Sequence, residues 1–232
     1  MRNRLFPWLT VGIVFICFSA QAGTIVENGA GSLPATAQDL TGLFPTEILG
    51  TLDGTNSNDV NVFEIDILNP VDFSAITVDA GPHSVHDTEL FLFDSAGFGV
   101  YFNDDIDFIN TLSCLPSSDA GNPCPNPAGG LGPLTAGTYF LAITRSFNSP
   151  LDALGNSIFT NSSSADVVGP NAGAGAIASW DDSGNADPDF DSIHYDIQLA
   201  GTTPEPATWT MLAGAGLAGL FIARKRRLGQ ES

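Results

Sequence analysis

The 232-residue chain carries 26 acidic and seven basic residues, a formal net charge of −19 at pH 7. Such a surface repels phosphate backbones, so nucleic acid is excluded as a partner, whereas cations and neutral polymers are permitted. Gly, Pro, Asn, Asp and Ser are abundant while Lys and Arg are scarce, which disfavours long surface helices; Phe, Ile, Val and Thr favour strands.

The N-terminus has the pattern of a secretory signal peptide. Two arginines near the start precede an apolar run over residues 5–18, and Ala20-Gln21-Ala22 satisfies the small-x-small rule for cleavage before Gly23. We therefore expect signal peptidase to remove residues 1–22 and the rest of the chain to be exported.

One exported domain is expected over residues 23–201, because about 180 residues are enough to bury a substantial core. Among the acids only Glu205 and Glu231 lie outside this body, and among the bases only Arg145 lies inside it. The body therefore carries 23 excess negative charges.

Strand patterns dominate the body. NVFEIDIL (61–68) and SIHYDIQL (192–199) alternate apolar and polar residues, as strands with one buried face do. TELFLFD (88–94) and GTYFLAIT (137–144) are apolar on both faces and are expected in the centre of the fold. Weaker strand candidates are ILGTL, FSAITVDA, FGVYF and AIASW.

Two Gly-, Pro- or Asn-rich stretches, residues 114–133 and 149–175, are expected to be long loops. Several short strands divided by turns, without a convincing amphipathic helix, predict an all-β fold. The expected architecture is a single antiparallel β-sandwich with long loops.

Oxygen ligands gather at the ends of the central strands and in one turn. Hard oxygen ligands clustered on loops are what Ca²⁺ requires. The pattern predicts a calcium site at Asp87, Asp94, Asn103, Asp104, Asp105 and Asp107. An EF-hand spacing is lacking, so the alternative is a set of solvated, turn-forming residues.

Three weaker candidate sites accompany this one. A second acidic group has the alternate-residue spacing of a calcium loop but no completing ligand: Asp181, Asp182, Asp187, Asp189 and Asp191. His83 and His86 have a spacing that can bind a transition metal, but a third strong ligand is not evident. Trp180, Phe147 and Phe159 offer a sugar-stacking platform, with a place in the core as the main alternative.

Catalytic patterns are weak, since the sequence has no G-x-S-x-G elbow and every Asp is also explained by turns or solubility. We therefore expect a protein that is not an enzyme.

Cys114 and Cys124 form an even pair within one loop of an exported chain, where an oxidising compartment favours a disulfide.

The C-terminal segment TPEPATWTMLAGAGLAGLFIARKRR joins a Pro-Glu-Pro motif to an apolar run and a basic cluster. A helix over residues 207–223 would reach roughly 25 Å, nearly the thickness of a bilayer core. Positive charge at 224–227 would stay on the cytoplasmic side, which places the body outside. One transmembrane helix is therefore expected to hold the exported precursor at the inner membrane.

This tail, residues 202–232, resembles the PEP-CTERM sorting signal of Gram-negative bacteria. The resemblance rests on Pro204-Glu205-Pro206, the apolar span, and the basic cluster Arg224, Lys225, Arg226 and Arg227. It implies that an exosortase, a membrane-embedded cysteine protease, removes the tail as the protein passes to the cell surface or into exopolysaccharide matrix. The alternative from the residues alone is a permanent, uncleaved anchor.

The body resembles the bacterial pre-peptidase C-terminal (PPC) domain, a small jelly-roll-like sandwich. The resemblance is carried by NDVNVFEIDI, DTELFLFDSAGFGVYFNDD, GPLTAGTYFLAIT and HYDIQLAG, in order and approximate spacing, across most of residues 50–201. The central stretch is the most specific part of the resemblance, and its characteristic polar positions are Asp87, Asp94 and Asn103-Asp104-Asp105. The cysteine loop and the long segment before Trp180 depart from the family as insertions. Domains of this family commonly accompany secreted peptidases as accessory or binding modules.

Three functional hypotheses follow. The leading one is an exported, non-catalytic surface or extracellular-matrix protein that associates with exopolysaccharide. The second is a carbohydrate-binding or peptidase-accessory module whose long loops hold a specific ligand. The third is a secreted hydrolase.

Overall fold

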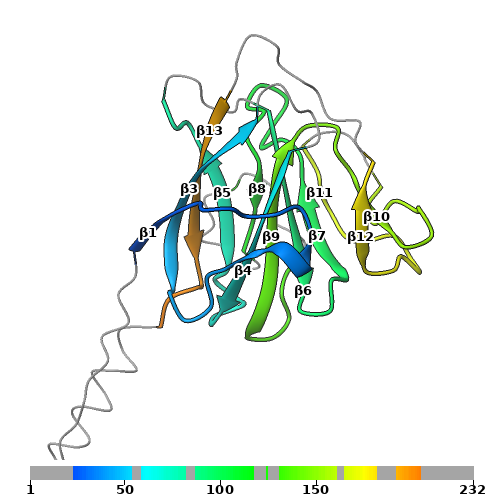
Figure 1. Ribbon diagram of the computed structural model, residues 1–232, viewed down its shortest axis with the longest axis horizontal. Helices are drawn as coiled ribbons and strands as arrows, with labels where there is room; N and C mark the ends of the chain where they lie inside the picture. The colour runs from blue at the N-terminus through cyan, green and yellow to red at the C-terminus, as the bar shows by residue number, and fades with distance from the viewer. Residues whose placement is uncertain are drawn as a thin grey trace, which may run out of the picture.

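The computed structural model describes residues 23–53, 59–81, 87–117, 124, 131–160, 165–181 and 192–204. These residues are mostly β: apart from one 3-10 turn, η1 (Pro34–Thr36), their regular structure is strands (Figure 1). For these residues the prediction of a mostly β fold with almost no helix is confirmed. Within the described ranges, no helix is long and apolar enough to cross a membrane.

A five-stranded sheet forms one layer, with strand order β1-β3-β13-β5-β8. Its strands are β1 (Gly23–Val26), β3 (Pro45–Asp53), β13 (Ser192–Ala200), β5 (Ser74–Val78) and β8 (Cys114–Leu115). The predicted alternating strand SIHYDIQL lies within β13, between β3 and β5.

A six-stranded sheet forms the second layer, with strand order β11-β7-β6-β9-β4-β2. Its strands are β11 (Val167–Val168), β7 (Gly99–Asn103), β6 (Thr88–Asp94), β9 (Gly137–Arg145), β4 (Val60–Ile67) and β2 (Gln38–Asp39). β6 and β9 lie side by side in the middle of this sheet, as their two apolar faces predicted.

The sheets are mixed, which corrects the expectation of purely antiparallel pairing. All the long strand pairs are antiparallel, but β1 runs parallel to β3 and β2 runs parallel to β4. Both exceptions lie at sheet edges near the N-terminus, where the chain crosses from one sheet to the other (Figure 1). Parallel pairing requires such a crossover rather than a tight hairpin.

The main apolar cluster lies between the two sheets. Phe63, Ile65 and Ile67 of β4 are each 0 % exposed, and Tyr195 and Ile197 of β13 pack in the same cluster from the opposite sheet. The alternation read from the sequence therefore identified the inward-facing side of both strands. The buried members of this cluster span residues 40–199, so the body carries its own core.

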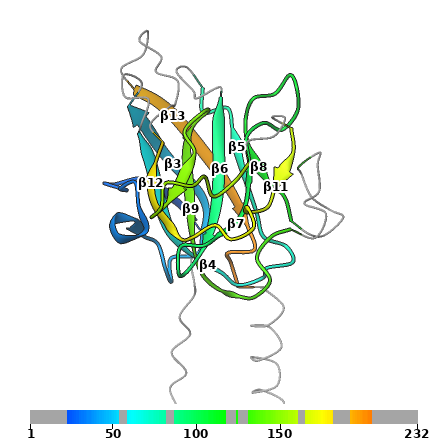
Figure 2. The ribbon, with the colours of Figure 1, turned by 90° about the vertical axis from the view of Figure 1, so that its right-hand side faces the viewer.

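A second apolar cluster lies on the outer face of the six-stranded sheet, the face whose ribbon is turned toward the viewer in Figure 2. Phe91 and Phe93 of β6 pack there with Ile158, Phe159 and Trp180. The covering segment includes the two-stranded sheet formed by β10 (Pro150–Asp152) and β12 (Ile177–Trp180). The described parts of the predicted long loop 149–175, residues 149–160 and 165–175, thus help to bury an apolar face of the central sheet.

Both chain ends of the body lie at one end of the sheets. Gly23 pairs with Pro45 at the start of β3, and the Thr202 hydroxyl donates to the carbonyl oxygen of Pro45 at 2.6 Å. At the other end, Thr88 pairs with Arg145. We call these the tail end and the acidic end; Figure 1 shows the chain entering at β1 and leaving after β13 on the same side.

Candidate functional site

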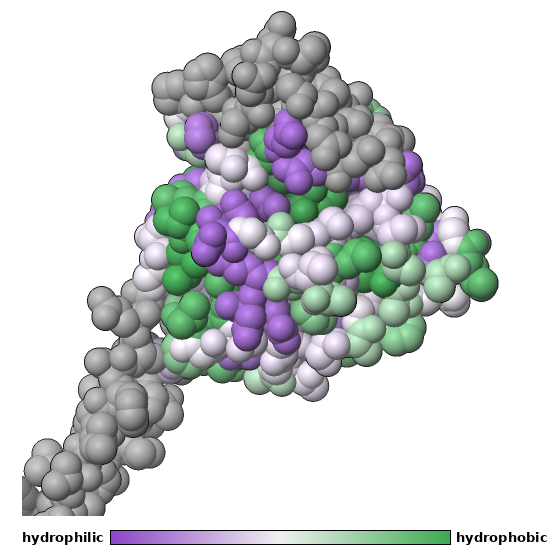
Figure 3. Space-filling view, in the orientation of Figure 1, coloured by the Kyte–Doolittle hydropathy of each residue, from purple (hydrophilic) through white to green (hydrophobic). Residues whose placement is uncertain are grey.

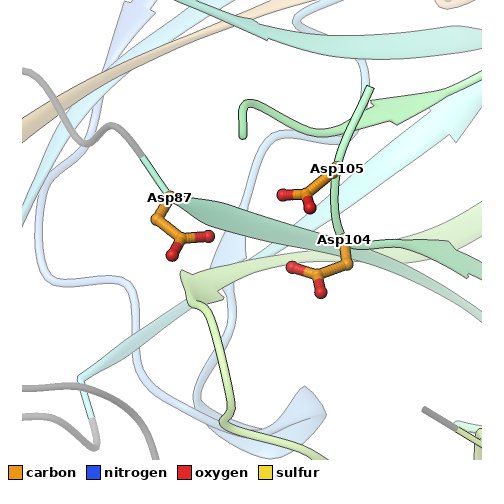
Figure 4. Close-up of side chains that lie close together, drawn as sticks. All are labelled: Asp87, Asp104 and Asp105. Atoms are coloured by element: carbon orange, nitrogen blue, oxygen red, sulfur yellow. The ribbon is translucent and has the colours of Figure 1, made fainter. Parts of the chain in front are cut away.

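Three aspartates converge at the acidic end. Asp87 immediately precedes β6, and Asp104 and Asp105 follow β7; because β6 and β7 pair antiparallel, the start of one strand lies beside the end of the other. One carboxylate oxygen from each aspartate lies within 4.8 Å of the others. Figure 4 shows the three carboxyl groups turned toward a common space.

The electrostatics of this trio reflect burial and mutual repulsion. Burial, followed by the charges of Asp105 and Asp87, raises the pKa of Asp104 to about 7, although the Ser146 hydroxyl donates to its Oδ1 at 3.4 Å. Burial and the Asp105 charge likewise raise the pKa of Asp87, which Arg145 partly opposes. A bound cation would relieve this repulsion.

Glu89 adds a fourth carboxyl group that sequence reasoning missed. It is 1 % exposed within β6, and burial together with the Asp104 charge raises its pKa to about 8. Its Oε2 accepts a hydrogen bond from the backbone N–H of Asn148 at 3.3 Å. The available signal was its position, an acid inside the otherwise apolar strand TELFLFD.

Asn148 contributes a buried oxygen beside Glu89. Its side chain is 0 % exposed, and its Nδ2 donates to the Thr144 hydroxyl at 3.1 Å. Its Oδ1 is buried and accepts no hydrogen bond within the described part of the chain. A buried acceptor in this state costs free energy, so a cation or water at this position would be stabilising.

The remaining predicted ligands lie elsewhere or have other partners. Asn103 holds the turn together, since its Oδ1 accepts from Cys114 N–H at 2.8 Å and its Nδ2 donates to the Asp105 carbonyl at 2.9 Å. The Asp107 carboxylate accepts the N–H groups of Ile109 and Asn110, which lowers its pKa.

Asp94 lies at the opposite end of β6, where it pairs with Tyr139 and closes the next turn by accepting the N–H groups of Ala96 and Phe98. Asp94 is the last of the seven residues of β6, whereas Asp87 immediately precedes the strand, so the two carboxylates cannot bind one ion. The structure thus brings together Asp87, Asp104 and Asp105 and adds Glu89.

Chemically, the acidic end is a cluster of hard oxygen donors with one positively charged side chain nearby, that of Arg145. Arg145 is the only Lys or Arg between residues 23 and 203. Ca²⁺ binds six to eight oxygens at 2.3–2.6 Å, from carboxylates, carbonyls and water. The donor set therefore fits calcium better than a transition metal, which prefers imidazole or thiolate ligands.

The predicted Cys114–Cys124 disulfide is present, with the two Cα atoms 5.9 Å apart. Cys114 lies in β8, and its N–H donates to Asn103 Oδ1, so Cys114 adjoins the turn that carries Asp104 and Asp105. The crosslink therefore restrains the same region of chain that presents the carboxylates.

Replacing both cysteines by alanine is expected to lower the free energy of unfolding by about 2–4 kcal/mol, because the crosslink restricts the unfolded chain. Urea denaturation with and without reductant measures the effect. Reductant should destabilise the wild-type protein and leave the alanine variant unchanged; equal sensitivity of the two proteins would contradict the expectation.

Two aromatic residues of the proposed sugar platform are core residues. Trp180 is 8 % exposed and Phe159 is 3 % exposed, both within the second apolar cluster. Phe147 is 50 % exposed. The platform therefore does not form.

Several other candidates lie outside the described residues. These are the signal peptide 1–22, the histidines His83 and His86, four of the five aspartates near residue 185, and the tail from Glu205 onward. The fifth aspartate, Asp181, accepts the backbone N–H of Ser149 at 3.0 Å.

Comparison with known families settles the nature of the tail. Residues 202–227 match the PEP-CTERM protein-sorting motif. The motif indicates an exported protein that begins as a membrane-anchored precursor, is sorted to the cell surface and is processed by an exosortase, a membrane protease. A search of curated proteins found no match.

Proposed function

We propose that the protein is a non-catalytic surface or extracellular-matrix component of a Gram-negative bacterium that associates with exopolysaccharide after its tail is removed. The observation that carries the proposal is the sorting motif at residues 202–227. The 23 excess negative charges of the body also support the proposal. They favour a hydrated surface and allow binding to neutral polymers, or to acidic polymers through bridging cations. Hydrophilic residues form a band down the face seen in Figure 3.

The body is proposed to be a jelly-roll sandwich of the PPC type. The strand order supports this: β3-β13-β5-β8 and β7-β6-β9-β4 form the two sheets. Among these eight strands the chain changes sheet at every step except the β6–β7 hairpin, which is the order of a jelly roll built from two Greek keys. The shared apolar cluster between the sheets supports the same assignment. The fold does not by itself assign an activity.

Processing gives the direct test of the proposed sorting. Intact-mass analysis of the protein from its native host is expected to show Gly23 as the first residue and an end near Pro204-Glu205-Pro206. Deleting the exosortase should leave the tail in place and the protein in the membrane fraction. A protein that still carries Trp209 to Arg227 at steady state in the wild-type host would instead be a permanent anchor.

Association with polymer is tested by separate fractionation. The processed protein should co-purify with host exopolysaccharide, and residues 23–204 made without the tail should bind that polymer again when mixed with it. A protein found entirely in the soluble medium, with no retention on the polymer, would contradict the matrix role and leave the processing result untouched.

Calcium is proposed to stabilise the acidic end through Asp87, Asp104 and Asp105, with Glu89 nearby. The melting temperature of residues 23–204 should rise more in calcium than in sodium chloride of equal ionic strength, because screening alone acts in both salts. At a hundredfold excess over Kd, binding to the folded form contributes about 2.7 kcal/mol.

Asp104→Ala combined with Asp105→Ala should remove this excess stabilisation. The matched control is Asp72→Ala with Asp79→Ala, which removes the same charge from two exposed sites. Identical melting temperatures of the wild-type protein in calcium and in sodium chloride would contradict the calcium site and would mean that these aspartates are ordinary polar turn residues.

A specific observation favours the carbohydrate-binding alternative. A pocket of about 410 Å³ opens at the tail end of the six-stranded sheet, lined by Asp94, Val100, Leu131, Leu134 and Tyr139 among others. A carboxylate, a phenol and aliphatic side chains suit the polar edge and apolar face of a sugar. A glycan array with a discrete hit that Asp94→Ala abolishes would support this function over the general matrix role.

A further inference from the structure

The last residues of the body are fixed at the tail end. Thr202 is 0 % exposed, and its hydroxyl donates to the Pro45 carbonyl oxygen at 2.6 Å. The carbonyl oxygen of Gly201 accepts the N–H groups of Leu68 at 2.8 Å and Asn69 at 2.9 Å. Gly201 has φ of 75°, and a Cβ added to it would lie 2.6 Å from the Asn69 carbonyl oxygen, so only glycine fits here. The chain therefore leaves the body at one defined point.

The tether from this point to the membrane is short. Only residues 203–206 separate Thr202 from Ala207, where the apolar run expected to span the membrane begins. Even fully extended, this stretch reaches at most roughly 18 Å. About 5–8 Å of that reach is needed to cross the headgroup layer on one side of the hydrocarbon core. In the membrane-anchored precursor, the exit point is therefore held within roughly 13 Å of the membrane surface.

Four loops lie at the tail end with the exit point. They are residues 40–44 before β3, 68–73 after β4, 95–98 between β6 and β7, and 131–136 before β9. Ile67 pairs with Gly137 and Asp94 pairs with Tyr139, so the end of β4, the start of β9 and the end of β6 adjoin one another. Figure 1 shows them on the side where β13 ends. We call these four segments the seating loops.

The composition of the seating loops differs from that of the rest of the body. They carry a single charged side chain, that of Asp72, although the body has 23 excess negative charges. At the opposite end of the sheets, Asp87, Asp104 and Asp105 converge. The seating loops also present apolar side chains to solvent, of which Leu134 is 87 % exposed and Val71 is 52 % exposed. The full set of exposed apolar side chains is Leu43, Leu68, Val71, Phe98 and Leu134.

This asymmetry favours one orientation of the body on a membrane. Anionic headgroups repel the carboxylates of the acidic end and have little charge to repel at the tail end. Binding to the headgroup region strengthens with the apolar area that is buried there. Because the tether is short, it also keeps the seating loops at a high effective concentration near the lipid, so individually weak contacts are sufficient.

We propose that the seating loops place the precursor on the membrane, with their exposed apolar side chains in the headgroup region of the lipid bilayer and the acidic end directed away from it. Seating holds Pro204-Glu205-Pro206 at the membrane surface, where a membrane-embedded protease works. The inference goes beyond the matrix role proposed above and rests only on the membrane-anchored precursor.

The test uses residues 23–232 reconstituted in vesicles of phosphatidylglycerol and phosphatidylethanolamine, with a polarity-sensitive fluorophore on one introduced cysteine. Cys114 and Cys124 are joined in a disulfide, so without reductant only the new thiol is labelled. The fluorophore on the Leu134→Cys protein should emit at shorter wavelength and be quenched by lipids that carry a nitroxide near the headgroup. Ile109→Cys is the matched control, since Ile109 is 94 % exposed at the acidic end, and its fluorophore should behave as it does in water.

A longer tether separates contact from mere proximity. An insert of about ten Gly and Ser residues after Thr203 adds roughly 30 Å of reach. With this insert, the fluorophore at residue 134 should stay quenched. Adding Leu43→Asp and Val71→Asp should release it, because charged side chains oppose entry into the headgroup region; an unchanged melting temperature would show that this variant is folded.

The outcomes distinguish this inference from the matrix role. A fluorophore at residue 134 that is as exposed to water as one at residue 109 would overturn the inference, and this comparison needs no aspartate variant. Release by the insert alone would overturn it as well, because the tether and not the loops would then hold the body near the lipid. Neither result would change the processing or exopolysaccharide tests.

Discussion

With calcium chelated, Glu89→Gln is expected to stabilise the protein at pH 8 by about 3 kcal/mol more than it does at pH 5. Glu89 is 1 % exposed, and burial raises its pKa from 4.5 to about 8. Between those values the folded state holds a proton that the unfolded state lacks. The free energy of unfolding of the wild-type protein therefore falls as pH rises through this window.

Asp104 adds to this fall of the free energy of unfolding with rising pH, because burial raises its pKa to about 7. Glutamine keeps an oxygen that can accept the Asn148 N–H but cannot ionise, so the variant should show a shallower fall of stability with pH. Urea denaturation at pH 5, 6.5 and 8 in chelator measures both slopes. Glu64→Gln, a half-buried position on β4, is the control and should retain the wild-type slope; equal slopes for wild type and Glu89→Gln would contradict the assignment.

The strands were predictable where side-chain periodicity was clear. Phe63, Ile65 and Ile67 alternate with polar residues, and this period alone identifies the buried face of β4. The two apolar faces of TELFLFD predicted a central strand, and β6 is covered on both sides. Periodicity does not identify pairing partners, so the parallel pairs β1–β3 and β2–β4 could not be predicted from it.

The second apolar cluster was missed because its covering segment has no period. Ile158 and Phe159 stand among Gly, Asn and Ser, a composition typical of loops. Their side chains are buried because they pack against Phe91 and Phe93 on the outer face of β6. Tertiary packing, rather than local sequence, orders this segment.

The candidate site was predictable in part for a geometric reason. Asp87, Asp104 and Asp105 meet because antiparallel strands bring the start of β6 beside the end of β7. Asp94 is close to Asp87 in sequence, but the intervening strand holds them roughly 20 Å apart. Glu89 was overlooked because a single acid in an apolar strand carries no motif.

Trp180→Ala is expected to lower the free energy of unfolding by about 3–5 kcal/mol, because it removes a large side chain from the second apolar cluster. Trp180 is 8 % exposed and packs edge-on against Phe91, with ring centroids 5.4 Å apart. Its Nε1–H also donates to the Ser32 carbonyl at 2.7 Å, so one side chain joins β12, β6 and the N-terminal segment.

Trp180→Phe separates packing from hydrogen bonding, because it keeps an aromatic ring but loses the donor to Ser32. It should cost less than alanine, with about 1–2 kcal/mol attributable to the lost hydrogen bond and the carbonyl left behind. Leu154→Ala, at an 86 % exposed position, should change the free energy of unfolding by less than about 0.5 kcal/mol. Urea denaturation followed by circular dichroism gives all three values. A Trp180→Ala protein as stable as Leu154→Ala would mean that residues 149–180 do not pack on the central sheet, and Trp180 would then return as a candidate for binding sugar.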